Sequence, residues 1–94
     1  MIFEYTLGTD DPAEAEKALD KEYRAVVAAA PDGENKKLLA DAQSAWRVYR
    51  TAEVALYRRA LGAKLGEAAV ERDLRARLAR ARIVTVKDKI SMEN

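Results

Sequence analysis

The sequence predicts an all-α fold with three helices, and three observations support this class. Of its 94 residues, 49% are hydrophobic but only 6% are aromatic, a balance that is typical of packed helices. Apolar side chains recur three and four positions apart over most of the chain, which is the period of an amphipathic helix. Proline and glycine interrupt this pattern at few places. We therefore expect an antiparallel three-helix bundle or hairpin with a long central helix, formed as one domain over residues 1–94.

Residues 1–9 alternate apolar and polar side chains, which predicts either a short strand or an arm packed on the helices. The first helix follows over about residues 12–30. Asp11 suits the N-cap, Pro12 the first helical position, and Glu14 the position three residues after the cap. Pro31 ends the helix because proline lacks an amide donor. The expected apolar face consists of Ala15, Ala18, Leu19, Tyr23, Val26 and Ala30.

The second helix is expected over about residues 33–61, capped by Asp32. The short turn at Asp32 and Gly33 makes it an antiparallel neighbour of the first helix. An apolar seam runs along this helix with alternating spacings of four and three, which indicates partners along its length. The members of the seam are Leu38, Ala42, Ala45, Tyr49, Ala52 and Leu56.

Gly62 and Gly66 predict a second corner, and an apolar stripe places a third helix over about residues 67–83. This stripe consists of Val70, Leu74, Leu78 and Ala81. A continuous helix through both glycines is the alternative; it would cost about 1 kcal/mol per glycine and would force dimerisation. The β-branched run at residues 83–86 either pairs with residues 3–5 or continues the third helix, and residues 87–94 are expected to form a frayed tail.

Composition excludes several classes of function. The net charge is +1, so no long-range field is expected to bring the protein to nucleic acid or to an anionic membrane. The absence of cysteine and histidine excludes thiol catalysis, disulfides and imidazole metal sites. No apolar run approaches the roughly 20 residues that span a bilayer. As written, the chain is expected in the cytoplasm, or in the periplasm or envelope if an N-terminal signal has been removed.

The charges are unevenly spread along the chain. Residues 1–47 carry six basic and ten acidic side chains, a net charge of −4, whereas residues 48–94 carry eleven basic and six acidic side chains, a net charge of +5. We expect the two halves to attract each other.

A stripe of polar and aromatic side chains shares the second helix with the apolar seam. With Tyr49, it forms the candidate binding site: Gln43, Trp46, Tyr49, Arg50, Glu53 and Tyr57. A lone charge near the apolar face is costly, so Glu53 is expected to form a buried ion pair with Arg50 or to face a ligand or partner. Trp46 is expected to anchor the core between the first two helices, or to be a binding hot spot if exposed. We favour the structural interpretation, in which the stripe of Trp46, Arg50 and Glu53 is buried between the first two helices.

Five arginines of the third helix suggest nucleic-acid contacts: Arg72, Arg75, Arg77, Arg80 and Arg82. They lie on several sides of the helix, and two follow an acid by four residues, Glu71 before Arg75 and Asp73 before Arg77, which favours a solvated, salt-bridged helix. Capping accounts for the acidic residues Asp10, Asp11 and Glu14, so no metal or cofactor is expected. No catalytic spacing is present, and we expect no enzymatic activity.

Two stretches carry a family resemblance. Leu-Asp-Lys-Glu-Tyr stands at residues 19–23, and Ala-Gln-Ser-Ala-Trp-Arg-Val-Tyr-Arg-Thr-Ala-Glu-Val stands at residues 42–54, preceded by Leu38 and Leu39. They resemble the Leu-Asn-x-x-Tyr and Ala-Gln-x-Ala-Trp-x-x-Tyr-Arg-x-x-Glu-Cys patterns of the lysozyme inhibitor LprI N-terminal domain family, in which exported, disulfide-stapled helical proteins are typical. Val54 stands in place of the signature cysteine.

The resemblance implies a non-enzymatic helical module that binds a protein partner, in the manner of an inhibitor. A homodimer is a further expectation from the seam. The alternative function is a basic helical regulatory domain that contacts nucleic acid.

Overall fold

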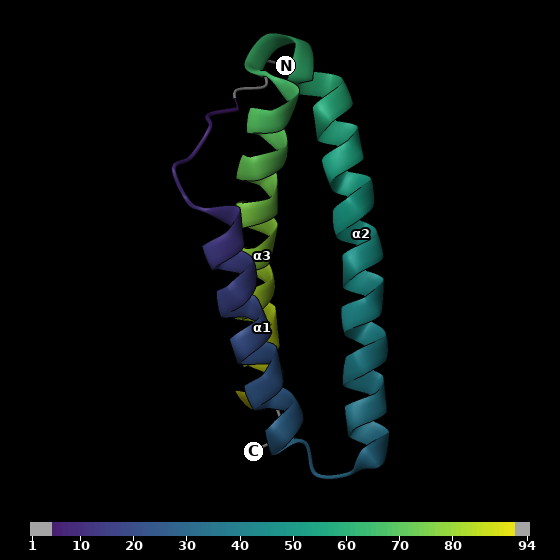
Figure 1. The fold of residues 1–94 in the computed structure, drawn as a ribbon. Helices are drawn as coiled ribbons and strands as arrows, with labels where there is room; N and C mark the ends of the chain where they lie inside the picture. Colours follow the sequence, from purple (N-terminus) through teal and green to yellow (C-terminus); the bar gives the residue numbers. More distant parts are fainter. Residues whose placement is uncertain (1–4, 92–94) are drawn as a thin grey trace.

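The computed structural model describes the backbone of residues 5–91 and the side chains of residues 5–88. It contains three helices, α1 (Pro12–Ala29), α2 (Gly33–Leu65) and α3 (Glu67–Ser91), each antiparallel to the next along the chain, in a molecule of 47 × 25 × 21 Å (Figure 1). The predicted all-α class with three helices is confirmed, and the described part of the chain contains no strand. Among the described residues, no helix is both long and apolar enough to cross a bilayer.

Two aspartates begin α1 and α2 as the sequence predicts. Asp11 accepts a hydrogen bond from the Ala13 amide at 2.9 Å, and Asp32 accepts one from the Asn35 amide at 2.8 Å. Each bond satisfies an amide that has no partner inside its helix. The turn between α2 and α3 is made by Gly66, whose φ of 92° is easily adopted only by glycine.

The helix that packs against both others is α3, and not α2 as expected. α1 lies along α3 and α2 packs on α3 from another side, whereas α1 and α2 make few direct contacts (Figure 1). The short turn does make α1 and α2 antiparallel, but the core does not form between them. α3 therefore positions every other part of the molecule.

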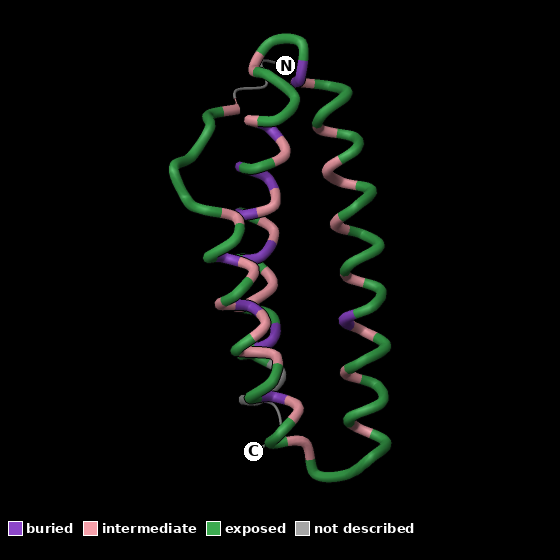
Figure 2. Tube along the Cα trace, in the orientation of Figure 1, coloured by how far each residue is buried: buried purple, intermediate pink, exposed green. Residues whose placement is uncertain are grey.

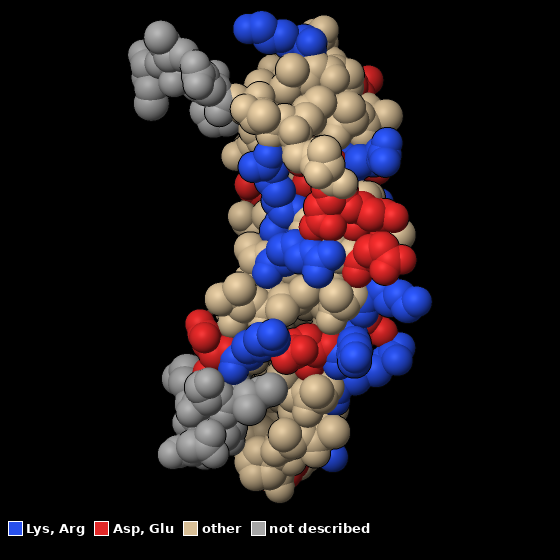
Figure 3. Space-filling model, turned by 90° about the vertical axis from the view of Figure 1, so that its left-hand side faces the viewer, with Lys and Arg blue, Asp and Glu red and all other residues tan. Residues whose placement is uncertain are grey.

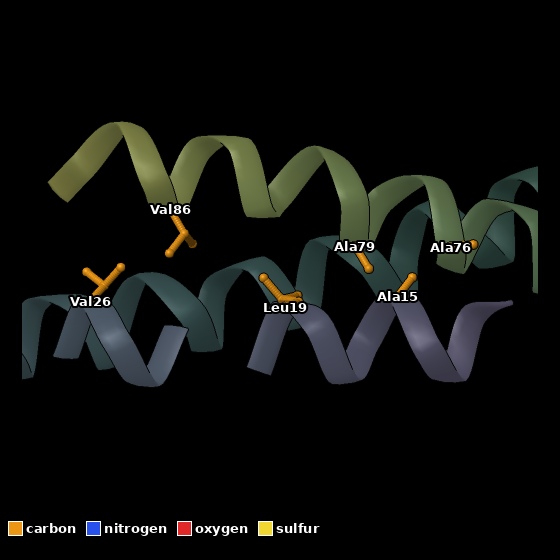
Figure 4. Close-up of a cluster of buried hydrophobic side chains, with 6 residues drawn as sticks. All are labelled: Ala15, Leu19, Val26, Ala76, Ala79 and Val86. Carbon is orange, nitrogen blue, oxygen red and sulfur yellow. The ribbon is translucent and has the colours of Figure 1, made fainter. Parts of the chain in front are cut away.

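The hydrophobic core lies between α1 and α3. Six side chains, none more than 5% exposed, point toward one another from these two helices (Figure 4): Ala15, Leu19, Val26, Ala76, Ala79 and Val86. Three of the six are alanine, and small side chains let two helix axes approach closely. Figure 2 shows the buried residues concentrated on α1 and α3, with the side of α2 that points away from them exposed.

Two helix ends differ from the prediction. α2 continues through Gly62 to Leu65 instead of ending near residue 61. Gly62 is buried because α3 begins directly against it, and a Cβ there would lie 2.5 Å from Cγ of Glu67. α3 continues to Ser91, so residues 83–86 are helical and the strand alternative for them is wrong. The predicted frayed tail is helical over residues 87–91, and residues 92–94 lie outside the described part.

An arm of irregular backbone, residues 5–11, precedes α1 and runs along α3 (Figure 1). Residues 5–9 form the packed arm, which is one of the two expectations for the N-terminal residues, and not a strand. Residues 1–4 lie outside the described part. The arm is fixed to α3 by Asp10, which pairs with Arg80 at 2.8 Å.

Candidate protein-binding face

The inner side of α2 carries five of the six candidate residues. Gln43 is only 4% exposed, and Trp46, Arg50, Glu53 and Tyr57 are half-buried. They are spaced three and four apart and therefore share one side of the helix. The stripe is packed against the rest of the fold, as expected. The expectation that it lies between α1 and α2 is wrong, because α2 packs mainly against α3.

Arg50 of α2 and Arg75 of α3 both bind the Glu16 carboxylate of α1, so this group connects all three helices. Nη1 of Arg50 donates to Oε2 of Glu16 at 2.8 Å, and Nη2 of Arg75 donates to the same oxygen at 3.2 Å. Arg50 also lies over the Trp46 ring, 5.3 Å from the ring centroid, within the range of a cation–π contact. Trp46 itself packs against the α1–α3 core, as expected for a core anchor. This corner is a structural junction.

The predicted ion pair between Arg50 and Glu53 is wrong. Arg50 binds Glu16, and no described residue forms a hydrogen bond or ion pair with Glu53. Glu53 is only partly buried, so water can solvate its carboxylate. It therefore does not need the charged partner that a fully buried carboxylate would require. Sequence reasoning missed Glu16 because the partner lies 34 residues away in another helix.

Gln43 is the most buried polar residue of the stripe. Its Oε1 accepts a hydrogen bond from Nε of Arg82 in α3 at 3.1 Å. Burial lowers the pKa of Arg82, but an arginine remains protonated at physiological pH. The bond explains how a polar side chain can lie on the packed side of α2.

Asp73 holds the arm on α3, a role that the sequence did not reveal. This carboxylate is 6% exposed and accepts hydrogen bonds from the Tyr5 hydroxyl, the Gly8 amide at 2.7 Å and Nε of Arg77 at 2.8 Å. Arg77 also donates to the Thr6 carbonyl. Burial raises the pKa of Asp73, but the bonds from Tyr5, Gly8 and Arg77 outweigh burial and hold it below its ordinary value.

Tyr57, at the end of the stripe, contacts this arm. Its ring centroid lies 5.9 Å from that of Tyr5, with the rings tilted by 58°. Burial, followed by the neighbouring Asp73 carboxylate, raises the pKa of Tyr5 to about 12. The inner stripe of α2 is therefore engaged with α1, α3 and the arm.

The apolar seam of α2 is exposed, contrary to the expectation that the fold covers it. Leu38, Tyr49 and Leu56 are 55%, 50% and 58% exposed, and the adjacent Val48 is 71% exposed. The smaller members Ala45 and Ala52 are exposed as well. Large apolar side chains at a regular helical spacing with no cover are typical of a surface that binds protein. This seam, which contains the sixth candidate residue, Tyr49, is the candidate functional site.

Four of the five arginines of α3 have partners within the described part of the fold: Arg75, Arg77, Arg80 and Arg82. Arg75 binds Glu16 and lies 3.6 Å from Glu71, and Arg77 binds Asp73. Both acid-first pairs predicted from the sequence are therefore present. On the face shown in Figure 3, basic and acidic side chains alternate and form no patch of one sign. The expected attraction between the two halves of the chain is also visible in the pairs of Asp10 and Glu16 with Arg80, Arg50 and Arg75.

The acidic residues near the start of α1 have structural partners. Asp10 pairs with Arg80 and Asp11 caps α1. Among the residues that the structure describes, no three acidic side chains gather into a group that could hold a metal ion.

A comparison with protein-family models matches residues 9–85 to the family described as lysozyme inhibitor LprI. The match covers α1, α2, the seam and most of α3. Comparisons with curated proteins and with solved structures found no match.

Proposed function

The chain belongs to the lysozyme inhibitor LprI family, and from this premise we propose that it is a non-enzymatic module that binds and inhibits a lysozyme through the seam of α2. The observation that carries the proposal is the exposure of Leu38, Tyr49 and Leu56 on a helix whose inner stripe is fixed to the rest of the fold. Family membership supplies the class of partner, and the uncovered seam supplies the surface.

The seam has the properties of a binding surface. Between Leu38 and Leu56 it extends for about 27 Å at 1.5 Å per residue, enough to cross the face of a small enzyme. Tyr49 lies at its middle, and tyrosine is among the residues that most often dominate binding energy at the centre of an interface. The leucines on either side can exclude water from this contact.

The seam is also rigid before binding. Trp46 and Arg50, on the inner side of the same helical turns, are fixed by the core and by Glu16. A side chain presented by a helix that is already ordered loses little conformational entropy on binding. Inhibition then requires only that the helix block substrate access, with no chemistry from this chain. Because lysozymes act on the cell wall, we place this function in the envelope.

Inhibition of a c-type lysozyme tests the proposal. The rate of cell-wall lysis is measured against inhibitor concentration for the wild type, Tyr49→Ala and Leu56→Ala. The matched control is Arg47→Ala, which changes an exposed residue on the far side of α2 from the seam. We expect inhibition by the wild type and by Arg47→Ala, and a loss of potency of about 10-fold or more in each seam variant.

Two results would contradict the proposal. One is a wild-type chain that does not slow lysis at any concentration reached. The other is equal potency of all four proteins, since inhibition would then use another surface. Unchanged helical circular dichroism in the variants excludes misfolding as the cause of a loss.

A further inference from the structure

The seam of α2 has nearly the same order of side-chain sizes in both directions, because reversal exchanges only the central residues Ala45 and Tyr49. From its N-terminal end it consists of Leu38, Ala42, Ala45, Tyr49, Ala52 and Leu56. Leucine stands at both ends, alanine follows at each end, and the central pair is one alanine and one tyrosine. The spacings of four, three, four, three and four are also unchanged on reversal. A surface with this property is complementary to a copy of itself that runs in the opposite direction.

Antiparallel pairing of two seams produces matched layers. Leu38 meets Leu56 of the second copy at each end, and Ala42 meets Ala52 of the second copy in the next layer. At the centre, Ala45 faces Tyr49 of the second copy, so that the largest side chain lies over one of the smallest. Alternation of large and small side chains across an interface lets two helices approach closely without leaving cavities.

Charges at the ends of the seam select the antiparallel direction. Glu34 lies one turn before Leu38, and Arg59 lies almost one turn after Leu56. Both are exposed, and neither forms an ion pair with any residue of the described chain. Antiparallel pairing brings Glu34 of each copy beside Arg59 of the other. Parallel pairing in register would place Glu34 beside Glu34 and Arg59 beside Arg59, which is unfavourable.

We propose that, in the free protein, the occupant of the seam is a second copy of this chain, paired antiparallel through α2. The pair is two-fold symmetric, with its axis at the middle of the seam, between Ala45 and Tyr49. One part of the inference rests on the proposed function, namely the competition between the two partners. Self-pairing and lysozyme binding use the same face and therefore exclude each other. Self-pairing covers the leucines and Tyr49 until the enzyme displaces the second copy.

Sedimentation equilibrium of the purified chain without lysozyme tests the pairing. We expect a mass twice that of the 10.5 kDa chain, falling to the mass of one chain on dilution. Ala45→Glu places a charge against Tyr49 of the second copy and should give the monomer mass with unchanged circular dichroism. A wild-type chain that is monomeric at all concentrations overturns the proposal.

Charge reversal tests the direction of pairing. Glu34→Arg and Arg59→Glu should each raise the dimer dissociation constant by about 10-fold, because each creates two like-charge contacts. The double variant restores opposite charges at both ends and should return the constant to within about 3-fold of the wild type. In a parallel dimer the double variant restores nothing, so failure of this rescue overturns the antiparallel arrangement.

The outcomes separate this inference from the proposed function. A monomeric chain that inhibits lysozyme contradicts self-pairing and leaves inhibition in place. A dimeric chain that does not inhibit lysozyme supports self-pairing and contradicts the proposed inhibition. If both proposals hold, Ala45→Glu should abolish the dimer, and adding lysozyme to the wild type should convert the dimer to a complex that contains one chain and one enzyme.

Discussion

Glu16 and Arg50 lie 34 positions apart, yet their side chains meet at 2.8 Å and join α1 to α2. The same carboxylate accepts from Arg75 of α3. Arg50 and Glu16 are 22% and 26% exposed, so the pair is partly shielded from water. Since α1 and α2 make few other contacts, this carboxylate carries much of the connection between them.

Removing the charge of Glu16 should therefore destabilise the fold. Glu16→Gln leaves the half-buried Arg50 without its anion and leaves Arg75 with Glu71 alone, and we expect the free energy of unfolding to fall by about 1–2 kcal/mol. Glu53→Gln is the matched control, because it makes the same chemical change at a carboxylate without a described partner and should shift stability by less than about 0.5 kcal/mol. Urea denaturation of both variants measures the difference. Equal effects would contradict the junction at Glu16.

Asp73→Asn should release the arm from α3. The amide cannot accept three hydrogen bonds with the strength of a carboxylate, and we expect a loss of about 2–3 kcal/mol in unfolding free energy. Hydrogen exchange at the Gly8 amide should accelerate, since this amide donates to Asp73. Asp41→Asn, at an exposed pair with Lys37, serves as the control and should leave both quantities nearly unchanged. Continued protection of Gly8 in Asp73→Asn would show that other contacts hold the arm.

The lowered pKa of Asp73 predicts that the free energy of unfolding depends on pH. The pKa of Asp73 is lower in the folded protein than its ordinary value of 3.8, so it contributes stability that is fully present above that value. This contribution is lost as the pH falls through 3.8 toward the folded pKa. Urea denaturation from about pH 6 to about pH 3 should show a steeper loss for the wild type than for Asp73→Asn. Parallel curves for the two proteins would contradict the assignment.

Trp46 should report on the core. Because its ring packs against the α1–α3 cluster, its fluorescence emission should be blue-shifted in the folded protein relative to the protein in urea. We expect Trp46→Ala to cost about 2 kcal/mol, less than for a fully buried indole. The control Val84→Ala removes an exposed apolar side chain from α3 and should cost less than about 0.5 kcal/mol. Emission at the wavelength of a fully hydrated indole would contradict the packing.

The sequence predicted the local features of this fold better than its packing. The caps at Asp11 and Asp32 and the buried positions Ala15, Leu19 and Val26 follow from signals that lie within one helix. The end of α2 was misplaced because Gly62 is required by the approach of α3, a contact between different parts of the chain.

The side of α2 that packs could not be predicted from α2 alone. The pattern predicted partners for its apolar seam as well as burial of its stripe. Only the stripe packs, because Glu16 of α1 and Arg82 of α3 supply partners to Arg50 and Gln43. The family signature drew attention to the stripe, while the proposed binding role of the seam rests on its exposure.

Methyl NMR of the chain during titration with a c-type lysozyme tests the central claim, that the seam of α2 is the binding surface. We expect selective shifts or broadening of the methyl groups of Leu38, Val48 and Leu56. The methyl groups of the core residues Leu19, Val26 and Val86 should not change. Perturbations that leave the seam unchanged and map to another surface, or a complete lack of perturbation, would contradict this claim.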